Sequence, residues 1–489
     1  MAQMRLAGYP QRMLAMLLVL YLLKQLFSVG AFPAFSGHDE LAHFAYIGVL
    51  ADQGRLPVLP DVAAWRQLSP TQRISPEYVD QIPAVLYPYC RYALDWYCEP
   101  DSPRWSADPP RVVTVRDQYY PSGYIYTANH PPLYYAVMTP LYKLSAGWSP
   151  TAQQYLLRVA AIPFGVATVV LAFLLATRLF PGDRFLAVTV PALVALQPQI
   201  SYEAAMVNND IVSIAVFSAI LYVLVLAIRD RFPRRASIAL GVLLGLGLLT
   251  KGTMITAAPV IGFAALLAVG WRDVRGLARR AFWIGAPAAV LALPWYAYMH
   301  AVYGNFDALA QVSALQWWNN PEGNFAELLG SSDFVLMRFK ETWGEYGWRL
   351  IHLGNDLLWA IGIVTALAIV GCYLYAATAG RHLAVNAGDP VMQPMRWQWL
   401  ALATLASACA IAYLAVVQFG VTFSLTQARY YFPVVNAAAL LGMLGLRTLI
   451  PPRWRPLGQG IIVAALIVLS AILFLQYVLP FAIGQSAAL

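Results

Sequence analysis

The chain has 489 residues, of which 60% are hydrophobic and only 11% are charged. A water-soluble domain of this size needs far more polar side chains to cover its surface. The composition therefore excludes a soluble globular protein and indicates one that crosses a membrane several times. Because backbone groups that face lipid must be hydrogen-bonded within the protein, we expect an all-α polytopic membrane protein.

The net charge of +8 comes largely from basic residues that lie between the hydrophobic segments. They occur at Arg178 and Arg184, within 229–235, within 272–280, at Arg381 and Arg396, and within 447–455. Such clusters mark cytoplasmic loops by the positive-inside rule. The excess charge therefore reflects topology, and no nucleic-acid partner is expected.

The first hydrophobic segment, residues 13–30, is long enough to span a bilayer. It is similar to a signal peptide, but no small-residue cleavage site follows it, so we interpret it as a retained first span. A polar segment rich in proline and aromatic residues continues to about Asn129. His130 then opens an apolar run that ends near Ser145. This run is too short to span, and we expect it to lie along the membrane interface.

Hydropathy and loop charge divide the rest of the chain into further spans, which gives about 11 in total. They are predicted at 155–179, 185–200, 211–228, 238–249, 253–270, 281–299, 357–377, 400–418, 430–446 and 461–479. With the basic loops inside, the N-terminus is cytoplasmic and the long polar segments are periplasmic. The expected location is the inner membrane of a bacterium.

The four cysteines fall into two groups. Cys372 and Cys409 lie within apolar runs and are expected to pack there. Cys90 and Cys98 share a polar segment on the expected periplasmic side, which is oxidising, so a disulfide between them is predicted. Two free thiols are the alternative.

Under this topology, ionisable side chains from remote parts of the chain gather at the periplasmic ends of the spans. Asp39 and Glu40 follow the first span in Ser36-Gly37-His38-Asp39-Glu40-Leu41-Ala42-His43. The others are His130, Asp210, Lys251 within a hydrophobic run, Arg429 with Tyr430, and Arg338, Lys340 and Arg349 of the second polar segment. The alternative for the last three is contact with lipid headgroups alone. Ionisable groups at or inside a membrane are costly and usually functional. The sequence therefore predicts a binding pocket at this face.

The order and sidedness of four motifs resemble the GT-C glycosyltransferases, which include protein O-mannosyltransferases and bacterial aminoarabinose transferases of lipid A. These motifs are Asp39-Glu40, His130-Pro131-Pro132-Leu133-Tyr134-Tyr135, Asp210 and Leu249-Thr250-Lys251-Gly252. The resemblance covers about residues 13–300, and residues 427–433 are similar to other bacterial GT-C-like proteins. It implies a catalytic module in 1–300 with a periplasmic loop at 31–130. A variable module would then occupy 301–489, with its own loop at 303–355.

The resemblance also implies an activity. A sugar would move from a polyprenyl-phosphate donor to a glycan, lipid or protein acceptor by an inverting single displacement. In the family the first aspartate of the pair is the general base, so Asp39 is expected to accept the acceptor's proton, with Glu40 orienting the acceptor. Lys251 and Arg429 are expected to hold the leaving phosphate. The other candidate substrate-binding residues are His43, His130, Asp210 and Tyr430.

Simpler interpretations of these residues stay open. Asp39 could bind a metal or cap a helix, and Glu40 could form a structural salt bridge. Asp210 could cap the fourth helix, and Lys251 could extend to the membrane interface. Aromatic residues of the outer loops could stack on sugars or belong to an interfacial belt; they are Trp96, Trp105, Tyr119, Tyr120, Trp317 and Trp318.

No cofactor is firmly predicted. A divalent metal stays open because some GT-C enzymes use one, whereas the mannosyl and aminoarabinose branches are not known for it. His38 and His43 could form a metal site with Asp39, but their spacing is not a recognised ligand motif and ordinary hydrogen-bonded histidines are favoured. Two other functions compete with glycosyl transfer. One is a transporter or flippase of lipid-linked glycans, and the other is a glycan polymerase or ligase.

Overall fold

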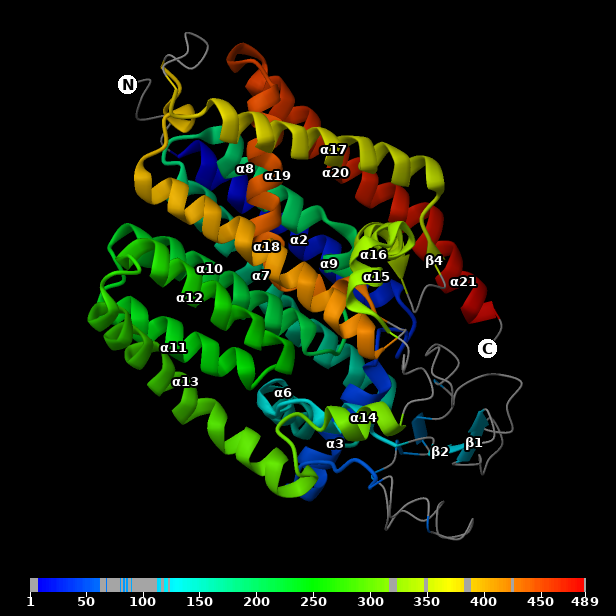
Figure 1. Ribbon diagram of the computed structural model, residues 1–489. Coiled ribbons are helices and arrows are strands. Elements are labelled where there is room, and N and C mark those ends of the chain that lie inside the picture. The colour runs from blue at the N-terminus through cyan, green and yellow to red at the C-terminus, as the bar shows by residue number, and fades with distance from the viewer. Residues whose placement is uncertain are drawn as a thin grey trace.

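The described residues are almost entirely helical, and Figure 1 shows the helices as a tilted bundle. The computed structural model describes residues 8–61, 124–315, 323–346, 351–381, 388–423 and 426–487, together with one strand pair and a few single residues between 62 and 123. The prediction of an all-α polytopic membrane protein is confirmed.

The helices and strands of the first part of the chain lie between Tyr9 and Tyr303. They are α2 (Tyr9–Ala31), α3 (Glu40–Gln53), β1 (Val112–Val115), β2 (Gln118–Pro121), η5 (Tyr126–Asn129), α6 (Leu133–Leu144), α7 (Pro150–Leu179), α8 (Arg184–Leu196), α9 (Pro198–Glu203), α10 (Asp210–Arg229), α11 (Arg234–Leu248), η6 (Gly252–Thr256), α12 (Ala257–Val269) and α13 (Val274–Tyr303).

The second part begins with short helices of the second polar segment and ends with four longer helical segments. Its elements are α14 (Leu309–Leu315), α15 (Phe325–Gly330), α16 (Ser332–Gly344), β3 (Glu345–Tyr346), β4 (Ile351–His352), α17 (Asn355–Thr378), η8 (Pro390–Met392), α18 (Arg396–Thr422), η9 (Ala428–Val434), α19 (Val435–Leu449), η10 (Pro452–Trp454), α20 (Arg455–Leu473), η11 (Phe474–Val478) and α21 (Leu479–Ala487). The strands form two short antiparallel pairs, β1 with β2 and β3 with β4.

Nine helical segments among the described residues are long and apolar enough to cross a bilayer, compared with about 11 predicted spans. The two predicted spans that fall short correspond to α8, with 13 residues, and α11, with 15. At 1.5 Å per residue each reaches only about 20–23 Å, which is less than the ~30 Å hydrocarbon core. In both cases the α-helix is interrupted although the chain continues: α8 stops before Pro198, and α11 stops before Lys251.

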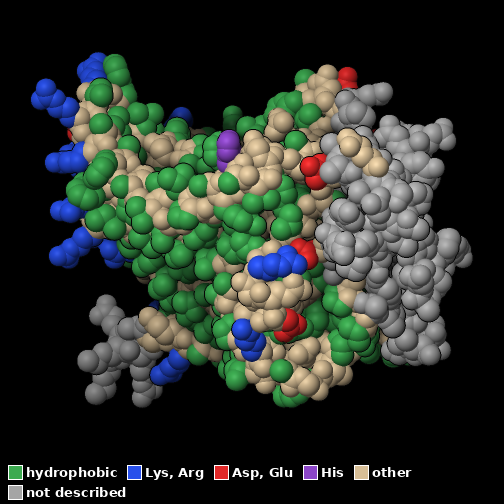
Figure 2. Space-filling view, turned by 90° about the horizontal axis from the view of Figure 1, so that it is seen from below, with side chains coloured by type: hydrophobic (Ala, Val, Ile, Leu, Met, Phe, Trp, Pro, Cys, Tyr) green, Lys and Arg blue, Asp and Glu red, His purple; other side chains and the backbone are tan. Residues whose placement is uncertain are grey.

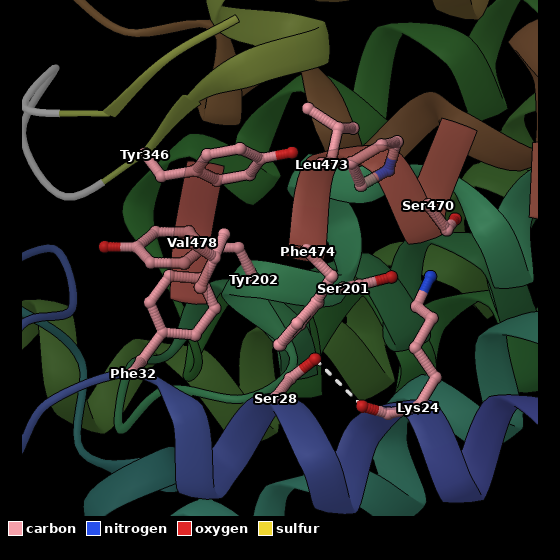
Figure 3. A pocket seen from close by; sticks show the side chains of 11 residues that line it. Lys24, Ser28, Phe32, Ser201, Tyr202, Tyr346, Ser470, Leu473, Phe474 and Val478 are labelled. Atoms are coloured by element: carbon pink, nitrogen blue, oxygen red, sulfur yellow. Dashed lines mark hydrogen bonds between the residues drawn. The ribbon is translucent and has the colours of Figure 1, made fainter. Parts of the chain in front are cut away.

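The break after α8 explains a lysine inside the first span. α8 ends at Leu196 because Pro198 starts α9 and has no backbone N–H to continue the ladder. The Lys24 ammonium donates to the Ala195 carbonyl at 2.9 Å, and the Ser470 hydroxyl donates to the Leu196 carbonyl at 2.8 Å. Lys24 lines a small cavity between α2, α9 and α20 (Figure 3). Lys24 therefore provides a hydrogen bond to a backbone carbonyl of α8 that lipid could not provide.

The basic loops lie on one side of the bundle. The clusters at 229–235 and 272–280 connect α10 to α11 and α12 to α13, so the intervening connection at Lys251 lies at the other end. Figure 2 shows Lys and Arg side chains projecting from one end of a mainly hydrophobic surface. We refer to this as the basic end.

An ion-pair network joins three segments of the basic end. Buried Arg447, in the last turn of α19, donates to Asp183 at 2.8 Å and to Asp389 at 2.9 and 3.0 Å. Asp183 is the N-cap of α8, and Asp389 precedes η8 and also pairs with Arg455 at 2.7 Å. The guanidinium thus ties α8, α19 and the segment before α18 together.

Helices α17 and α19 approach so closely that only glycine fits at their contact. A Cβ built on Gly445 of α19 would lie 2.0 Å from the Ala368 carbonyl oxygen of α17, and one on Gly371 would lie 2.0 Å from the Gly445 oxygen. Small residues that allow backbones to approach are a common basis of helix packing in membranes. Gly442, also in α19, has nothing within 4 Å of its Cβ position.

We predict that Gly445→Ala destabilises the protein by about 1–3 kcal/mol, because the methyl group forces α17 and α19 apart. Gly442→Ala is the matched control in the same helix and should leave stability unchanged or slightly increased, because alanine favours a helix. Thermal unfolding in detergent, followed by tryptophan fluorescence, measures both. Equal stability of the two variants would mean that the close approach of the backbones is not required.

Candidate active site

Four charged side chains from distant parts of the chain meet at the end of the bundle opposite the basic end. The Arg429 guanidinium contacts Asp39 through Nη2, and it contacts Asp210 through Nη1 at 3.2 Å. The Lys251 ammonium contacts the other carboxylate oxygen of Asp210. All four side chains are 12% exposed or less. Two cations and two carboxylates therefore form one charge-neutral cluster, which we call the charge cluster.

The turn between α2 and α3 places Asp39. Asp39 is the N-cap of α3 and has a φ of 56°, in the left-handed region, which aspartate tolerates better than most residues. The Tyr126 hydroxyl donates to Oδ1 at 3.0 Å, while Arg429 holds Oδ2. Backbone conformations of this kind are concentrated at functional sites.

Glu40 fixes this turn to the neighbouring helices through hydrogen bonds of its buried carboxylate. Its buried carboxylate accepts hydrogen bonds from Arg158 Nε and Nη2 at 2.8 and 2.7 Å and from Gln154 at 2.6 Å. The backbone N–H groups of Val207 and Gly37 add bonds of 2.9 and 3.0 Å. A carboxylate offers about four lone-pair sites, so all of them are used. This geometry favours the structural salt bridge over the predicted role of Glu40 in orienting the acceptor.

Asp210 and Lys251 come from two neighbouring helix ends. Asp210 is the first residue of α10, whose N-cap is Asn209, and its carboxylate makes no cap bond. Lys251 lies in extended conformation at the break between α11 and η6, and its side chain is buried against Asp210 rather than extended to the interface. The two simpler interpretations, helix capping by Asp210 and an interfacial lysine, therefore do not describe the structure.

Tyr430 covers the two cations of the charge cluster. Its ring centroid lies 4.9 Å from Lys251 Nζ and 5.3 Å from Arg429 Cζ. An aromatic face at this distance attracts a cation and excludes water from one side of it. Tyr430 thus limits the direction from which a ligand can approach Lys251 and Arg429.

A hydrogen-bonded chain of side chains lies beside the cluster. Tyr135 Oη is 2.8 Å from His43 Nδ1 and 3.3 Å from His130 Nδ1. The Asn209 amide donates to the Thr250 carbonyl, which fixes its orientation, and it also donates to His130 Nδ1 at 3.2 Å. His130 Nδ1 is therefore an acceptor, and the Tyr135 hydroxyl links its ring to that of His43.

Burial and charge set the protonation states next to the cluster. Burial alone would raise the pKa of Asp39, but the Arg429 charge outweighs it and holds the pKa of that carboxyl well below its usual value. Burial lowers the pKa of His43 to about 4 and the pKa of His130 well below its usual value. At neutral pH Asp39 is therefore ionised, and both histidines are neutral.

Other predicted residues lie elsewhere or cannot be placed. His38 bonds to Glu203 at 2.9 Å, away from His43. Among the described residues, no group of three or more His, Cys, Asp or Glu side chains could hold a metal ion. Arg338 contacts the Thr426 carbonyl and Glu341 rather than only lipid headgroups. Lys340 lies in α16, and Cys372 and Cys409 are free thiols of intermediate exposure in α17 and α18. The structure does not describe the side chains of Cys90, Cys98, Trp96, Trp105, Tyr119, Tyr120, Trp317, Trp318 and Arg349, so the predictions for them lie outside the described residues.

The sequence reasoning missed Arg158, Tyr126 and Glu341. Arg158 had a clear signal, because it is a single arginine within an apolar span, where an unpaired charge is costly. Tyr126 and Glu341 had none, since tyrosines and glutamates are common in polar loops. Their roles depend on contacts with residues that are 87 positions away in the chain.

Comparison with known proteins places part of this chain in a family context. Residues 129–298 match the family model described as dolichyl-phosphate-mannose-protein mannosyltransferase. The matched segment contains His130, Asp210 and Lys251. None of the proteins with curated descriptions matches the chain.

Solved structures of GT-C enzymes resemble the whole chain. The apo oligosaccharyltransferase of Archaeoglobus fulgidus has a TM-score of 0.51 and 14% identity, over 98% of this chain and 56% of its own. ArnT of Cupriavidus metallidurans bound to undecaprenyl phosphate has a TM-score of 0.45 and 15% identity, over 92% of this chain and 63% of its own. This chain thus spans less than two thirds of either enzyme. The predicted GT-C resemblance and fold are confirmed.

We predict that Glu40→Gln destabilises the fold by about 3–5 kcal/mol, because it leaves the buried Arg158 charge without its partner. The Glu40 and Arg158 side chains are both 0% exposed, so solvent cannot compensate. Asp39→Asn, at the neighbouring and partly exposed position, should unfold at a temperature much closer to that of the wild type. A Glu40→Gln protein with wild-type stability would contradict the anchoring role of Glu40.

Proposed function

We propose that this protein is a membrane glycosyltransferase that takes a sugar from a polyprenyl-phosphate carrier at the extracytoplasmic face. The observation that carries the proposal is the charge cluster, in which a lysine and an arginine lie beside a partly exposed aspartate. The family matched by residues 129–298 is named for a lipid-phosphate sugar donor, which supports the same substrate class.

Lys251 and Arg429 would bind the carrier's phosphate. A lipid-linked donor enters sideways from the bilayer, so its phosphate lies at the depth of the helix ends where these cations are found. As the sugar leaves, the phosphate gains negative charge, and fixed cations stabilise that change. Because both cations are now paired with carboxylates, the phosphate has to replace Asp39 or Asp210 as their partner.

This exchange would prepare Asp39 for its role as base. Once Arg429 turns to the phosphate, the force that keeps the pKa of Asp39 low is weakened, while burial continues to raise it. The acceptor oxygen then attacks the anomeric carbon from the face opposite the phosphate, and the bond between that carbon and the phosphate oxygen breaks. The bonding electrons go to the phosphate, and the acceptor's proton goes to Asp39. The product has inverted configuration.

The residues around Asp39 would position the acceptor and the sugar. The imidazole of His43 can form a hydrogen bond with a sugar hydroxyl, and its ring is held by Tyr135. Tyr430 offers an aromatic face beside the cations, which suits an apolar sugar face. Asp210 would keep Lys251 oriented toward the phosphate. We propose no metal in this reaction.

The positive-inside rule would place the basic end in the cytoplasm and the charge cluster on the opposite side of the membrane. In a bacterium this side of the inner membrane is the periplasm. A donor presented there has already crossed the bilayer on its lipid, so the enzyme would need no nucleotide sugar.

The direct test is incubation of the purified protein in nanodiscs with a panel of radiolabelled polyprenyl-phosphate monosaccharides. Release of free polyprenyl phosphate together with labelled acceptor or labelled sugar supports the proposal. Movement of intact donor across proteoliposomes without release would instead identify a transporter. Activity only with diphosphate-linked oligosaccharides would identify a polymerase or ligase.

We predict that Asp39→Asn reduces transfer by at least about 1,000-fold, because the amide cannot accept the acceptor's proton. Donor binding should be as tight as in the wild type or tighter, because Lys251 and Arg429 are retained and the Asp39 charge no longer competes for Arg429. Turnover and equilibrium binding of the same radiolabelled donor separate the two effects. Retained turnover in this variant would assign the base to another residue.

We predict that Arg429→Gln raises the pH at which Asp39 takes up a proton. With the arginine, the pKa of Asp39 stays well below the ordinary value of about 4, so pairing stabilises the fold above about pH 4 and loses this effect as the pH falls further. Without it, the strongest of the charges that oppose burial is gone, so the pKa of the carboxyl should rise. Infrared difference titration, with Asp39→Asn subtracted, measures this. An unchanged carboxyl titration would show that Arg429 does not control Asp39.

A further inference from the structure

The segment that carries Arg429 is held from outside by another helix. Arg429 is the second residue of η9, and two residues just before it, Thr426 and Ala428, contact α16 of the second polar segment. The Glu341 carboxylate accepts a hydrogen bond from the Ala428 N–H at 2.9 Å. The Arg338 guanidinium donates to the Thr426 carbonyl. Two residues one turn apart on α16 thus fix the backbone immediately before Arg429.

Glu341 and Arg338 act as one unit. Arg338 Nε lies 2.8 Å from Glu341 Oε2, and the two side chains are only 11% and 6% exposed. A buried charged pair of this kind is rigid, because moving either group away would leave the other as an unpaired charge in an apolar environment. The helix itself is also fixed, since Ser331 caps its start and the Gln197 amide donates to the Thr342 carbonyl near its end.

The Ala428 N–H is one of the donors at the start of η9 that have no hydrogen-bond partner within the helix itself. Gln427, the N-cap of this helix, makes no side-chain cap bond. The first N–H groups of a helix need partners from elsewhere. Glu341 fills this role from a position 87 residues away, so the start of η9 depends on a loop helix rather than on its own sequence.

We infer that Glu341 is a positioning residue for Arg429, and that through it the loop helix α16 sets where the phosphate-binding guanidinium lies. This inference rests on the proposed role of Arg429. The loss of Glu341 frees the backbone at Ala428, and a guanidinium at the end of a flexible segment no longer meets Lys251 at a fixed spacing. Sequence changes in α16 therefore act on donor binding.

A double-mutant cycle tests this inference with tritiated undecaprenyl phosphate as the probe, bound to the full-length protein in nanodiscs. Glu341→Ala should weaken binding about tenfold in the wild-type background, in keeping with the misplacement of one charged hydrogen-bond donor. In the Arg429→Ala background the same change should weaken binding less than about twofold, because the group that it positions is gone. An equal loss in both backgrounds, or none in the wild type, would overturn the inference.

Asp333→Asn is the matched control, because it removes the same charge from an exposed position of the same helix. It should leave binding unchanged, and a loss equal to that of Glu341→Ala would overturn the inference. If Glu341→Ala does not purify in folded form, Glu341→Met, which fills similar space without an oxygen acceptor, is carried through the same cycle with the same two criteria.

A second measurement separates this inference from the proposed function. Ala428 is 2% exposed, and its contact with Glu341 is through the backbone, so Ala428→Cys keeps that bond. Labelling by a membrane-impermeant thiol reagent, corrected for the parent protein with its native cysteines, should accelerate at least about fivefold when Glu341→Ala is added, and not with Asp333→Asn. Unchanged labelling would overturn the inference. If Arg429→Ala binds the carrier as tightly as the wild type, the proposed phosphate role of Arg429 is wrong, and the labelling alone decides whether α16 holds this segment.

Discussion

Three buried or largely buried carboxylates at the candidate site are each paired with a cation from a distant part of the chain. Asp39 meets Arg429, Asp210 meets Lys251 and Arg429, and Glu40 meets Arg158. A charge at the membrane boundary has too little water to stay ionised by itself, so each acidic residue forces a specific contact between spans. These contacts fix how α3, α7, α10 and η9 lie relative to one another. The site and the fold therefore depend on the same ion pairs.

The fold and the location of the charge cluster could be predicted because membrane proteins restrict the choices. Hydropathy identifies the spans, loop charge orients them, and ionisable residues at the helix ends then collect on one face. Asp39, Asp210, Lys251 and Arg429 were predicted to share that face, and they are in contact. The catalytic and binding roles assigned to them stay predictions.

The pairing within the cluster could not be read from the sequence. Glu40 and Asp39 are neighbours of the same type, yet one is fully enclosed by Arg158 and backbone N–H groups while the other faces Tyr126 and Arg429. The left-handed φ of Asp39 directs the two neighbouring side chains to different partners, and so decides which carboxylate holds the turn between α2 and α3. The sequence also predicted full spans where α8 and α11 are too short to cross the bilayer. Hydropathy is averaged over a window, so it does not detect an interruption of the helix such as the one before Pro198.

The neutrality of the cluster has a consequence for the proposed reaction. Because Arg429 and Lys251 already have carboxylate partners, a donor phosphate gains only the difference between two ion pairs, and donor binding is weaker than two free cations would give. That loss has a compensating effect. Asp39 is a very weak base while Arg429 holds it, and it becomes a stronger one only after a phosphate has taken the arginine away. An acceptor that arrives first finds no base, so the exchange of partners at Arg429 would impose an order in which the donor binds before the acceptor. The position of that single guanidinium, set in turn by α16, then links the second loop to the chemistry at Asp39.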